Sequence, residues 1–171
     1  PSVVLSLTRE LAPVMTALLV AGRVGSAIAA EVGAMNVYEE IDALKTLNIN
    51  PVRYLVMPRL LASVIAVPAL AMYVNVIGLL GGAVVSAINP KISVSLRLFR
   101  LNFQEVVKFS DVMDSVIKSV VFGMVVAVTC CYVGLRTTGG PEEIGRAVTR
   151  AVVLSFMLIF VLNYLITRSL M

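Results

Sequence analysis

Long apolar stretches alternate with shorter polar stretches along the chain. The apolar stretches cover about residues 3–32, 60–88, 112–135 and 151–167. Each reaches the length of a transmembrane helix, which needs roughly 17 to 25 mainly apolar residues. The pattern therefore predicts an all-α polytopic bundle with four membrane spans, forming one domain over residues 1–171.

The polar stretches between the spans predict the orientation of the bundle. Residues 33–59 and 136–150 would lie on one side of the membrane, and residues 89–111 on the other. The first side has the basic residues Lys45, Arg53, Arg59, Arg136, Arg146 and Arg150, and the second has Lys91, Arg97, Arg100 and Lys108. Because cytoplasmic loops are enriched in Lys and Arg, the first side is predicted to be cytoplasmic and residues 89–111 extracytoplasmic.

A short amphipathic helix is predicted over residues 36–47, between the first two spans. Asn36 is a favourable N-cap, and Glu39 three residues later would complete a capping box. Lys45 falls in the closing turn, where a cation favours the helix dipole. The helix is far too short to cross a membrane, so it would lie flat or dock.

This short helix has one apolar stripe and an acidic first turn. Val37, Ile41 and Leu44 are spaced as i, i+4 and i+7, so they would share one face. The acids beside them are Glu39, Glu40 and Asp42. Resting among lipid headgroups is one interpretation, but anionic headgroups would repel these acids. A protein partner with a groove and a basic rim fits better.

Small residues recur at every fourth position of the first span: Ala17, Ala21, Gly25, Ala29 and Gly33. Such a ridge lets another helix approach closely. We interpret it as a surface for ordinary helix packing.

Several charged residues lie in or at the edge of the spans. Arg9, Glu10 and Arg23 belong to the first span, and Lys118 lies near the start of the third. A charge at mid-membrane costs about 2.5 to 3.5 kcal/mol on insertion scales. Arg9, Thr16 and Arg23 are spaced by sevens and are predicted to share a face. Snorkelling to the interface is an alternative for each charge alone; together they predict a polar chamber inside the bundle.

Composition narrows the function classes. The chain is 59% hydrophobic and 14% charged, with mean hydropathy +0.97, so it is an integral membrane protein. Its net charge is +4, but the basic residues are scattered and form no patch for nucleic acid. Cys130 and Cys131 are adjacent, without metal-ligand spacing, and are predicted to pack or face lipid. A membrane enzyme is disfavoured, because there is no His and no paired carboxylate in a span.

Three segments resemble one known family. They are LTRELAPVMTALLVAGRVGSAIAAEVGAMNVYEEIDALKTLNINPVRYLVMPRLLA, IKSVVFG and GRAVTRAVV. They resemble the permeases of Mla/Mce-type ABC transporters, which move phospholipids between the bacterial inner membrane and the outer envelope. The resemblance implies that the four spans are the last four of five. Because the chain starts at Pro1, we expect it to begin partway through a longer protein.

The resemblance also implies roles and partners. Residues 36–47 would be the coupling helix, which docks on the ATPase through Val37, Glu39, Glu40, Ile41, Asp42 and Leu44. Arg9 and Glu10 match the Arg-Glu pair of the family motif RELGP, in which Ala12 here replaces Gly, and Lys118 matches the Lys of IKSVVF. These residues would line the lipid-binding chamber, with Arg9 or Lys118 holding the phosphate.

The expected complex lies in the bacterial inner membrane. It contains two ATPase subunits, a second permease copy and an MCE-domain lipid-binding protein. The chain has no G-x-x-x-x-G-K-[ST] phosphate loop, so no cofactor is expected in it, and ATP and Mg would be bound by the ATPase. An ATP-independent secondary transporter or channel that uses the intramembrane charges is the alternative.

Overall fold

The described part of the chain is entirely helical. The computed structural model describes residues 10–88 and 109–170. Its helices are α2 (Ala12–Val20), η2 (Ala21–Gly25), α3 (Ser26–Val37), α4 (Glu40–Thr46), η3 (Val52–Val56), α5 (Met57–Ile88), α7 (Phe109–Leu135) and α8 (Pro141–Leu170).

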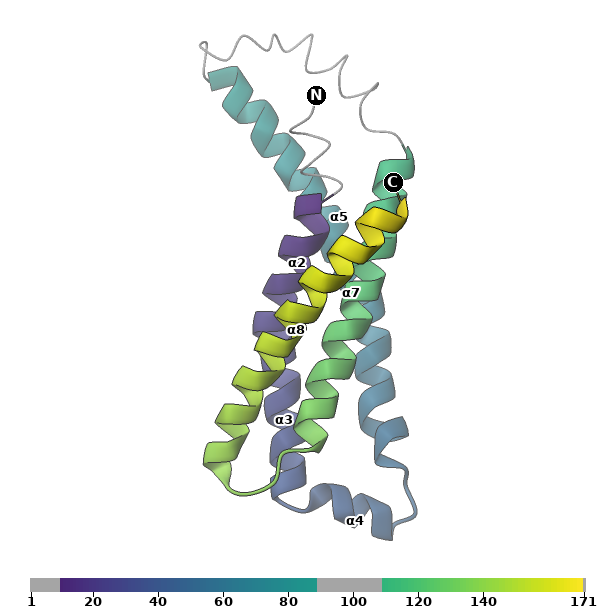
Figure 1. Ribbon diagram of the computed structural model, residues 1–171, viewed down its shortest axis with the longest axis vertical. Helices are drawn as coiled ribbons and strands as arrows, with labels where there is room; N and C mark the ends of the chain where they lie inside the picture. The colour runs from purple at the N-terminus through teal and green to yellow at the C-terminus, as the bar shows by residue number, and fades with distance from the viewer. Residues whose placement is uncertain (1–9, 89–108, 171) are drawn as a thin grey trace.

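Four long helical segments are apolar enough to cross a membrane: Ala12–Val37, Val52–Gly78, Met113–Leu135 and Pro141–Ser169. They run lengthwise in Figure 1, and the short helix α4 crosses one end of the bundle, which we call the α4 end. The first described residues and the last turns of α8 lie toward the opposite end. The predicted all-α bundle with four spans is confirmed for the described residues.

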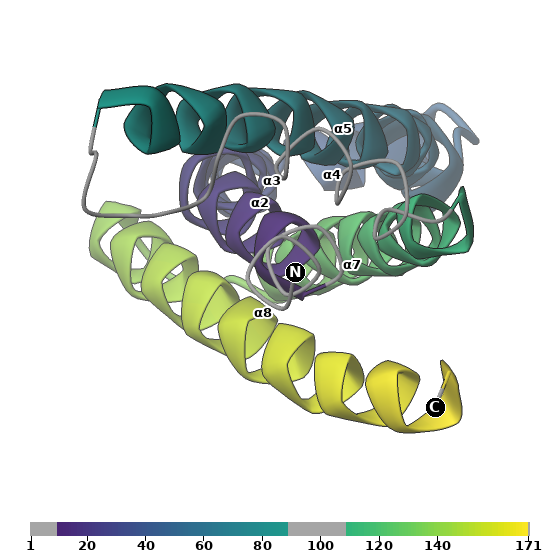
Figure 2. The ribbon, with the colours of Figure 1, turned by 90° about the horizontal axis from the view of Figure 1, so that it is seen from above.

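Helix α7 lies in the interior of the bundle. It packs against α2, α3, α5 and α8. Viewed from above, α2, α3 and α7 lie between α5 and α8 (Figure 2). The core formed there includes Val32, Phe122, Val126 and Ile159, all buried. Side chains on α5 and α8 that face away from this core are largely exposed, as expected for helices that meet lipid or another chain.

The ridge of small residues on the first span packs against α7. Ala17, Ala21 and Ala29 are fully buried. A methyl group built on Gly25 would lie only 2.9 Å from the Sγ atom of Cys130. The packing interpretation of the ridge is therefore confirmed, and the neighbour it contacts is a helix of the same chain.

Both cysteines are packing residues. Cys130 and Cys131 are free thiols buried in the core. The lipid-facing alternative is wrong, because both side chains point into the bundle around α7.

A π-helical segment interrupts the first span at η2, between α2 and α3. Thr16 before it is 3% exposed, whereas Arg23 within it is exposed. The prediction that these two residues share a face is wrong, because the wider π turn shifts the register that a regular α-helix would keep.

The predicted loop over residues 136–150 is wrong in its second part, because α8 begins at Pro141. Proline suits the first position of a helix, and Glu142 and Glu143 favour the dipole of the first turn. Arg146 bonds both carboxylates, at 2.8 and 2.9 Å. Hydropathy located only the apolar part of this helix, whereas its first turns are polar and lie before the apolar run.

Candidate functional site

A buried ion pair lies in the half of the bundle away from the α4 end. The Lys118 Nζ atom on α7 lies 2.7 Å from Glu10 Oε1 and donates a hydrogen bond of 2.8 Å to Thr167 Oγ1 on α8. The Thr167 hydroxyl in turn donates to Glu10 at 3.1 Å. The three residues are far apart in sequence, so the cluster joins the start of the first span to α7 and α8.

The two charges of this pair are unequally covered. The side chain of Lys118 is 1% exposed and that of Glu10 is 34% exposed. Removing a cation this deeply from water is costly unless an anion and hydrogen-bond acceptors compensate it. Glu10 and Thr167 supply both. Because the ammonium is enclosed and bonded, Lys118 cannot contact a lipid phosphate directly in this arrangement.

The structure therefore separates the sequence-predicted chamber residues. Glu10 pairs with Lys118 and holds its ammonium group in place. Arg9 lies outside the described residues. Arg23 does not join the cluster: it is exposed on the first span, well away from Glu10 along the chain.

Uncharged polar side chains extend the buried polar region. Asn163 on α8 lies near the Glu10 carboxylate. Asn75 on α5 donates a hydrogen bond of 3.4 Å to Ser115 Oγ on α7. The Oδ1 atoms of Asn75 and Asn163 and the Oγ1 atom of Thr16 are buried without a partner among the described residues. Sequence reasoning named Thr16 but missed Asn75, Ser115 and Asn163, although an amide inside an apolar run is a usable signal.

The opposite end of the bundle holds the predicted coupling helix, and its N-terminus differs from the prediction. Asn36 lies inside α3, and its amide donates a hydrogen bond of 2.8 Å to the carbonyl oxygen of Thr137. Glu39 precedes α4 in the left-handed conformation, with φ of 62°, and makes no side-chain cap bond. The predicted capping box is wrong because α3 continues through Val37, which leaves a sharp turn before α4.

The faces of α4 also differ from the predicted stripe. Ile41 is 3% exposed, so its side chain packs within its own chain and does not face a partner. Val37 ends α3 rather than lying on α4, and Leu44 is half-buried. An outward-facing Ile41 is thus wrong, whereas docking through Val37 and Leu44 stays a prediction.

Acidic and apolar side chains form the exposed surface around α4. Glu39, Glu40 and Asp42 are exposed, and Asp42 pairs with Lys45 at 2.7 Å. Leu47, just after the helix, is 69% exposed. We call the exposed surface made by Tyr38, Glu39, Glu40, Asp42 and Leu47 the α4 surface. It suits a protein partner with basic and apolar groups.

Comparison with known proteins identifies the family. The family described as Permease MlaE matches residues 1–169. The chain belongs to the MlaE permease family. Residues 10–88 and 109–170 contain no group of His, Cys, Asp and Glu side chains that could hold a metal ion.

Relatives of this MlaE-family chain include bacterial and chloroplast proteins. A probable ABC transporter permease protein of Rickettsia typhi is 44% identical over 168 residues, which cover 98% of this chain and 64% of the relative. One of the same description from Synechocystis is 45% identical over 167 residues, covering 95% and 61%. The chloroplastic protein TRIGALACTOSYLDIACYLGLYCEROL 1 of Arabidopsis thaliana is 37% identical over 163 residues, covering 95% and 46%.

These matches place the chain in a permease family whose bacterial relatives are described as probable ABC transporter permease proteins. Its described residues include four helices long and apolar enough to cross a membrane. It spans less than two thirds of the length of these relatives.

Proposed function

We propose that this permease moves phospholipids between a bacterial inner membrane and an MCE-domain partner, as part of outer-membrane lipid homeostasis. The observation that carries the proposal is the buried Glu10–Lys118–Thr167 cluster, which places charge inside an otherwise apolar bundle. A molecule with a charged headgroup and apolar tails needs both kinds of surface. One MlaE-family relative, the chloroplast protein, is named after a glycerolipid, which supports a lipid substrate.

In this proposal ATP and Mg are bound by two separate ATPase subunits that contact the α4 surface. Movement of α4 would pass to α3, which is the last part of the first span. The hydrogen bond from Asn36 to the Thr137 carbonyl links α3 to the end of α7. Since Lys118 lies on the same helix α7, a displacement at the α4 end can shift the ion pair as a rigid-body movement.

A second permease copy would complete the lipid cavity. Arg23 is exposed near the middle of the first span and forms no side-chain hydrogen bond or ion pair with the described residues. A single copy surrounded by lipid would leave this charge in hydrocarbon, at about 2.5 to 3.5 kcal/mol on insertion scales. Two copies facing each other across a polar, hydrated cavity would remove that cost.

The phosphate contact is assigned to Arg9, and the ion pair has a positioning role. A guanidinium holds two phosphate oxygens at once, whereas a carboxylate repels them. The neighbouring Glu10 is bonded to the enclosed Lys118. This pair would hold the start of the first span in place, so that Arg9 faces the headgroup.

Native mass spectrometry of the purified transporter tests this assignment. Arg9→Ala should lower the bound phospholipid about tenfold, the loss expected for one charged hydrogen bond, while basal ATP hydrolysis is retained. Arg9→Lys should recover part of the bound phospholipid, since lysine keeps the positive charge but cannot hold two phosphate oxygens at once as a guanidinium does. Arg168→Ala, an exposed arginine in the last turn of α8, is the matched control and should keep the full load. A full phospholipid load in Arg9→Ala would refute the headgroup assignment.

An ATP-independent secondary transporter or channel is the competing function, since a buried ion pair could also serve an ion path. Affinity purification from native membranes distinguishes the two. An ATPase subunit recovered in equal amount, together with lipid transport that stops without ATP, supports the ABC transporter. Transport that persists without ATP would exclude it.

A further inference from the structure

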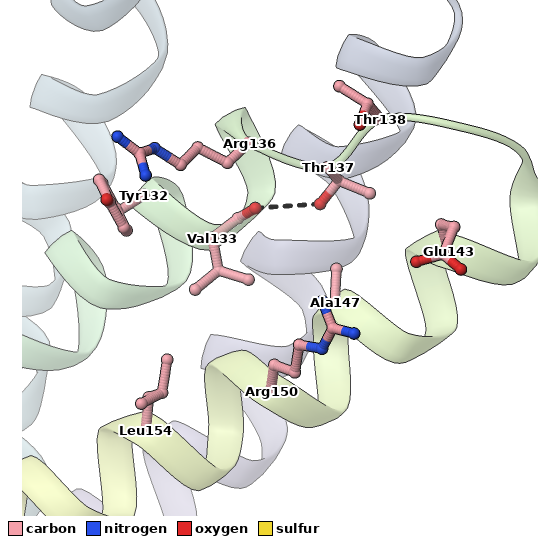
Figure 3. Close-up of a pocket in the computed structure, with 9 residues that line it drawn as sticks. All are labelled: Tyr132, Val133, Arg136, Thr137, Thr138, Glu143, Ala147, Arg150 and Leu154. Atoms are coloured by element: carbon pink, nitrogen blue, oxygen red, sulfur yellow. Dashed lines mark hydrogen bonds between the residues drawn. The ribbon is translucent and has the colours of Figure 1, made fainter.

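A pocket lies at the α4 end, in the corner between α7 and α8. Its volume is about 270 Å³. Figure 3 shows it between the last turns of α7 and the first turns of α8. Its lining residues are Tyr132, Val133, Arg136, Thr137, Thr138, Glu143, Ala147, Arg150 and Leu154. It lies at the end of the bundle away from the Glu10–Lys118 pair, so it is a separate site.

The walls of the pocket change from polar to apolar toward the membrane interior. On α8 the lining residues Glu143, Ala147, Arg150 and Leu154 are three or four positions apart and therefore form one stripe. Glu143 lies in the first turn of the helix, while Leu154 lies within the apolar run that starts at residue 151. Arg150 thus falls at the boundary between the polar turns and the span.

The pocket has more positive than negative charge. Arg150 is exposed and forms no hydrogen bond or ion pair with the residues that the structure describes. The guanidinium of Arg136 lies 4.6 Å from the centre of the Tyr132 ring, which holds it on the α7 wall. Glu143 is the acid among the lining residues, and its carboxylate already accepts a bond of 2.9 Å from Arg146.

We propose that this pocket binds the phosphate-bearing headgroup of an anionic lipid from the cytoplasmic leaflet. Arg150 would contact the phosphate, because a guanidinium offers paired donors in the geometry of phosphate oxygens. The lipid's chain would follow Leu154 and Val133, the apolar part of the lining. Basic side chains at the membrane boundary favour anionic over zwitterionic lipids, and a polar rim above an apolar wall suits a lipid better than free phosphate.

The bound lipid would stabilise the contact between α3 and the end of α7, next to α4. Thr137, which lines the pocket, also accepts the hydrogen bond from Asn36 through its carbonyl oxygen. A headgroup at this corner therefore contacts the connection between α3 and α7. This site is independent of the proposed transport of lipid, because it requires neither ATP nor the Glu10–Lys118 pair.

Tryptophan fluorescence in nanodiscs tests the proposal at the site itself. The chain contains no Trp, so Tyr132→Trp adds a single reporter to it, and the parent complex gives the signal to subtract. Brominated phosphatidylglycerol should quench this reporter at about fivefold lower mole fraction than brominated phosphatidylcholine. Arg150→Ala should abolish the preference and Arg150→Lys should keep part of it. Arg53→Ala, an exposed arginine on the same side and outside the pocket, should leave it unchanged.

Equal quenching by the two lipids, or a preference that survives Arg150→Ala, would overturn the proposal. Inorganic phosphate, added at constant ionic strength, tests whether the pocket binds free phosphate instead of the phosphate of a lipid headgroup. If it removes the phosphatidylglycerol preference, the site takes free phosphate and the lipid assignment is wrong. Leu154→Trp is the second reporter if Tyr132→Trp lowers the thermal stability of the complex. Loss of lipid transport in Arg9→Ala with this quenching intact would show that the two sites are independent.

Discussion

Neutralising the two members of the buried ion pair should have unequal effects on stability. Glu10→Gln leaves the Lys118 ammonium, 1% exposed, without its anion. Breaking a buried pair in this way costs about 3 to 5 kcal/mol, and we expect the lower end because Thr167 still accepts a bond. Lys118→Met removes the enclosed charge with little change of volume. The carboxylate of Glu10, 34% exposed, can then be hydrated, so we expect a cost of about 1 kcal/mol.

The double variant should be more stable than Glu10→Gln alone. With the cation gone, the amide introduced at position 10 leaves no uncompensated charge, so the coupling energy should be about 2 kcal/mol. The assay is unfolding of the purified permease in mixed micelles by titration with dodecyl sulfate, followed by loss of helical circular dichroism. Equal costs for the two single variants, or additive costs in the double variant, would show that Lys118 is hydrated and that the burial argument is wrong.

Two further predictions concern packing and coupling. Gly25→Ala should lower the midpoint of unfolding, because the new methyl group would lie 2.9 Å from the buried sulfur of Cys130. Gly22→Ala is the control and should not lower it, because the nearest neighbour there is at 4.0 Å. Equal midpoints for the two variants would contradict the close contact at Gly25. Leu47→Asp should weaken co-purification of the ATPase without loss of permease stability, whereas Ile41→Asp should destabilise the permease itself because Ile41 is 3% exposed. If the Ile41→Asp permease is stable but no longer co-purifies with the ATPase, Ile41 contacts the ATPase as the sequence predicted.

The sequence by itself determined the spans and the family. Runs of apolar residues this long have few folded alternatives to membrane helices, because a helix bonds its own backbone where no water is present. The ridge ending at Gly33 was also predictable, since its four-residue period survives as a row of buried small side chains. Motif similarity gave the permease family, which the family match confirms over residues 1–169.

Only the tertiary structure decided which polar groups meet. Glu10 and Lys118 are 108 residues apart, and each could have snorkelled or faced lipid; their contact depends on how the first span packs against α7. The η2 segment, which moves Arg23 off the face of Thr16, has no sequence signal that hydropathy could detect. The inward face of α4 was equally hidden, because α3 extends through Val37 and the left-handed turn at Glu39 then directs Ile41 into its own chain. Local patterns fix where a helix can form, whereas its rotation and its partners follow from packing that joins distant residues.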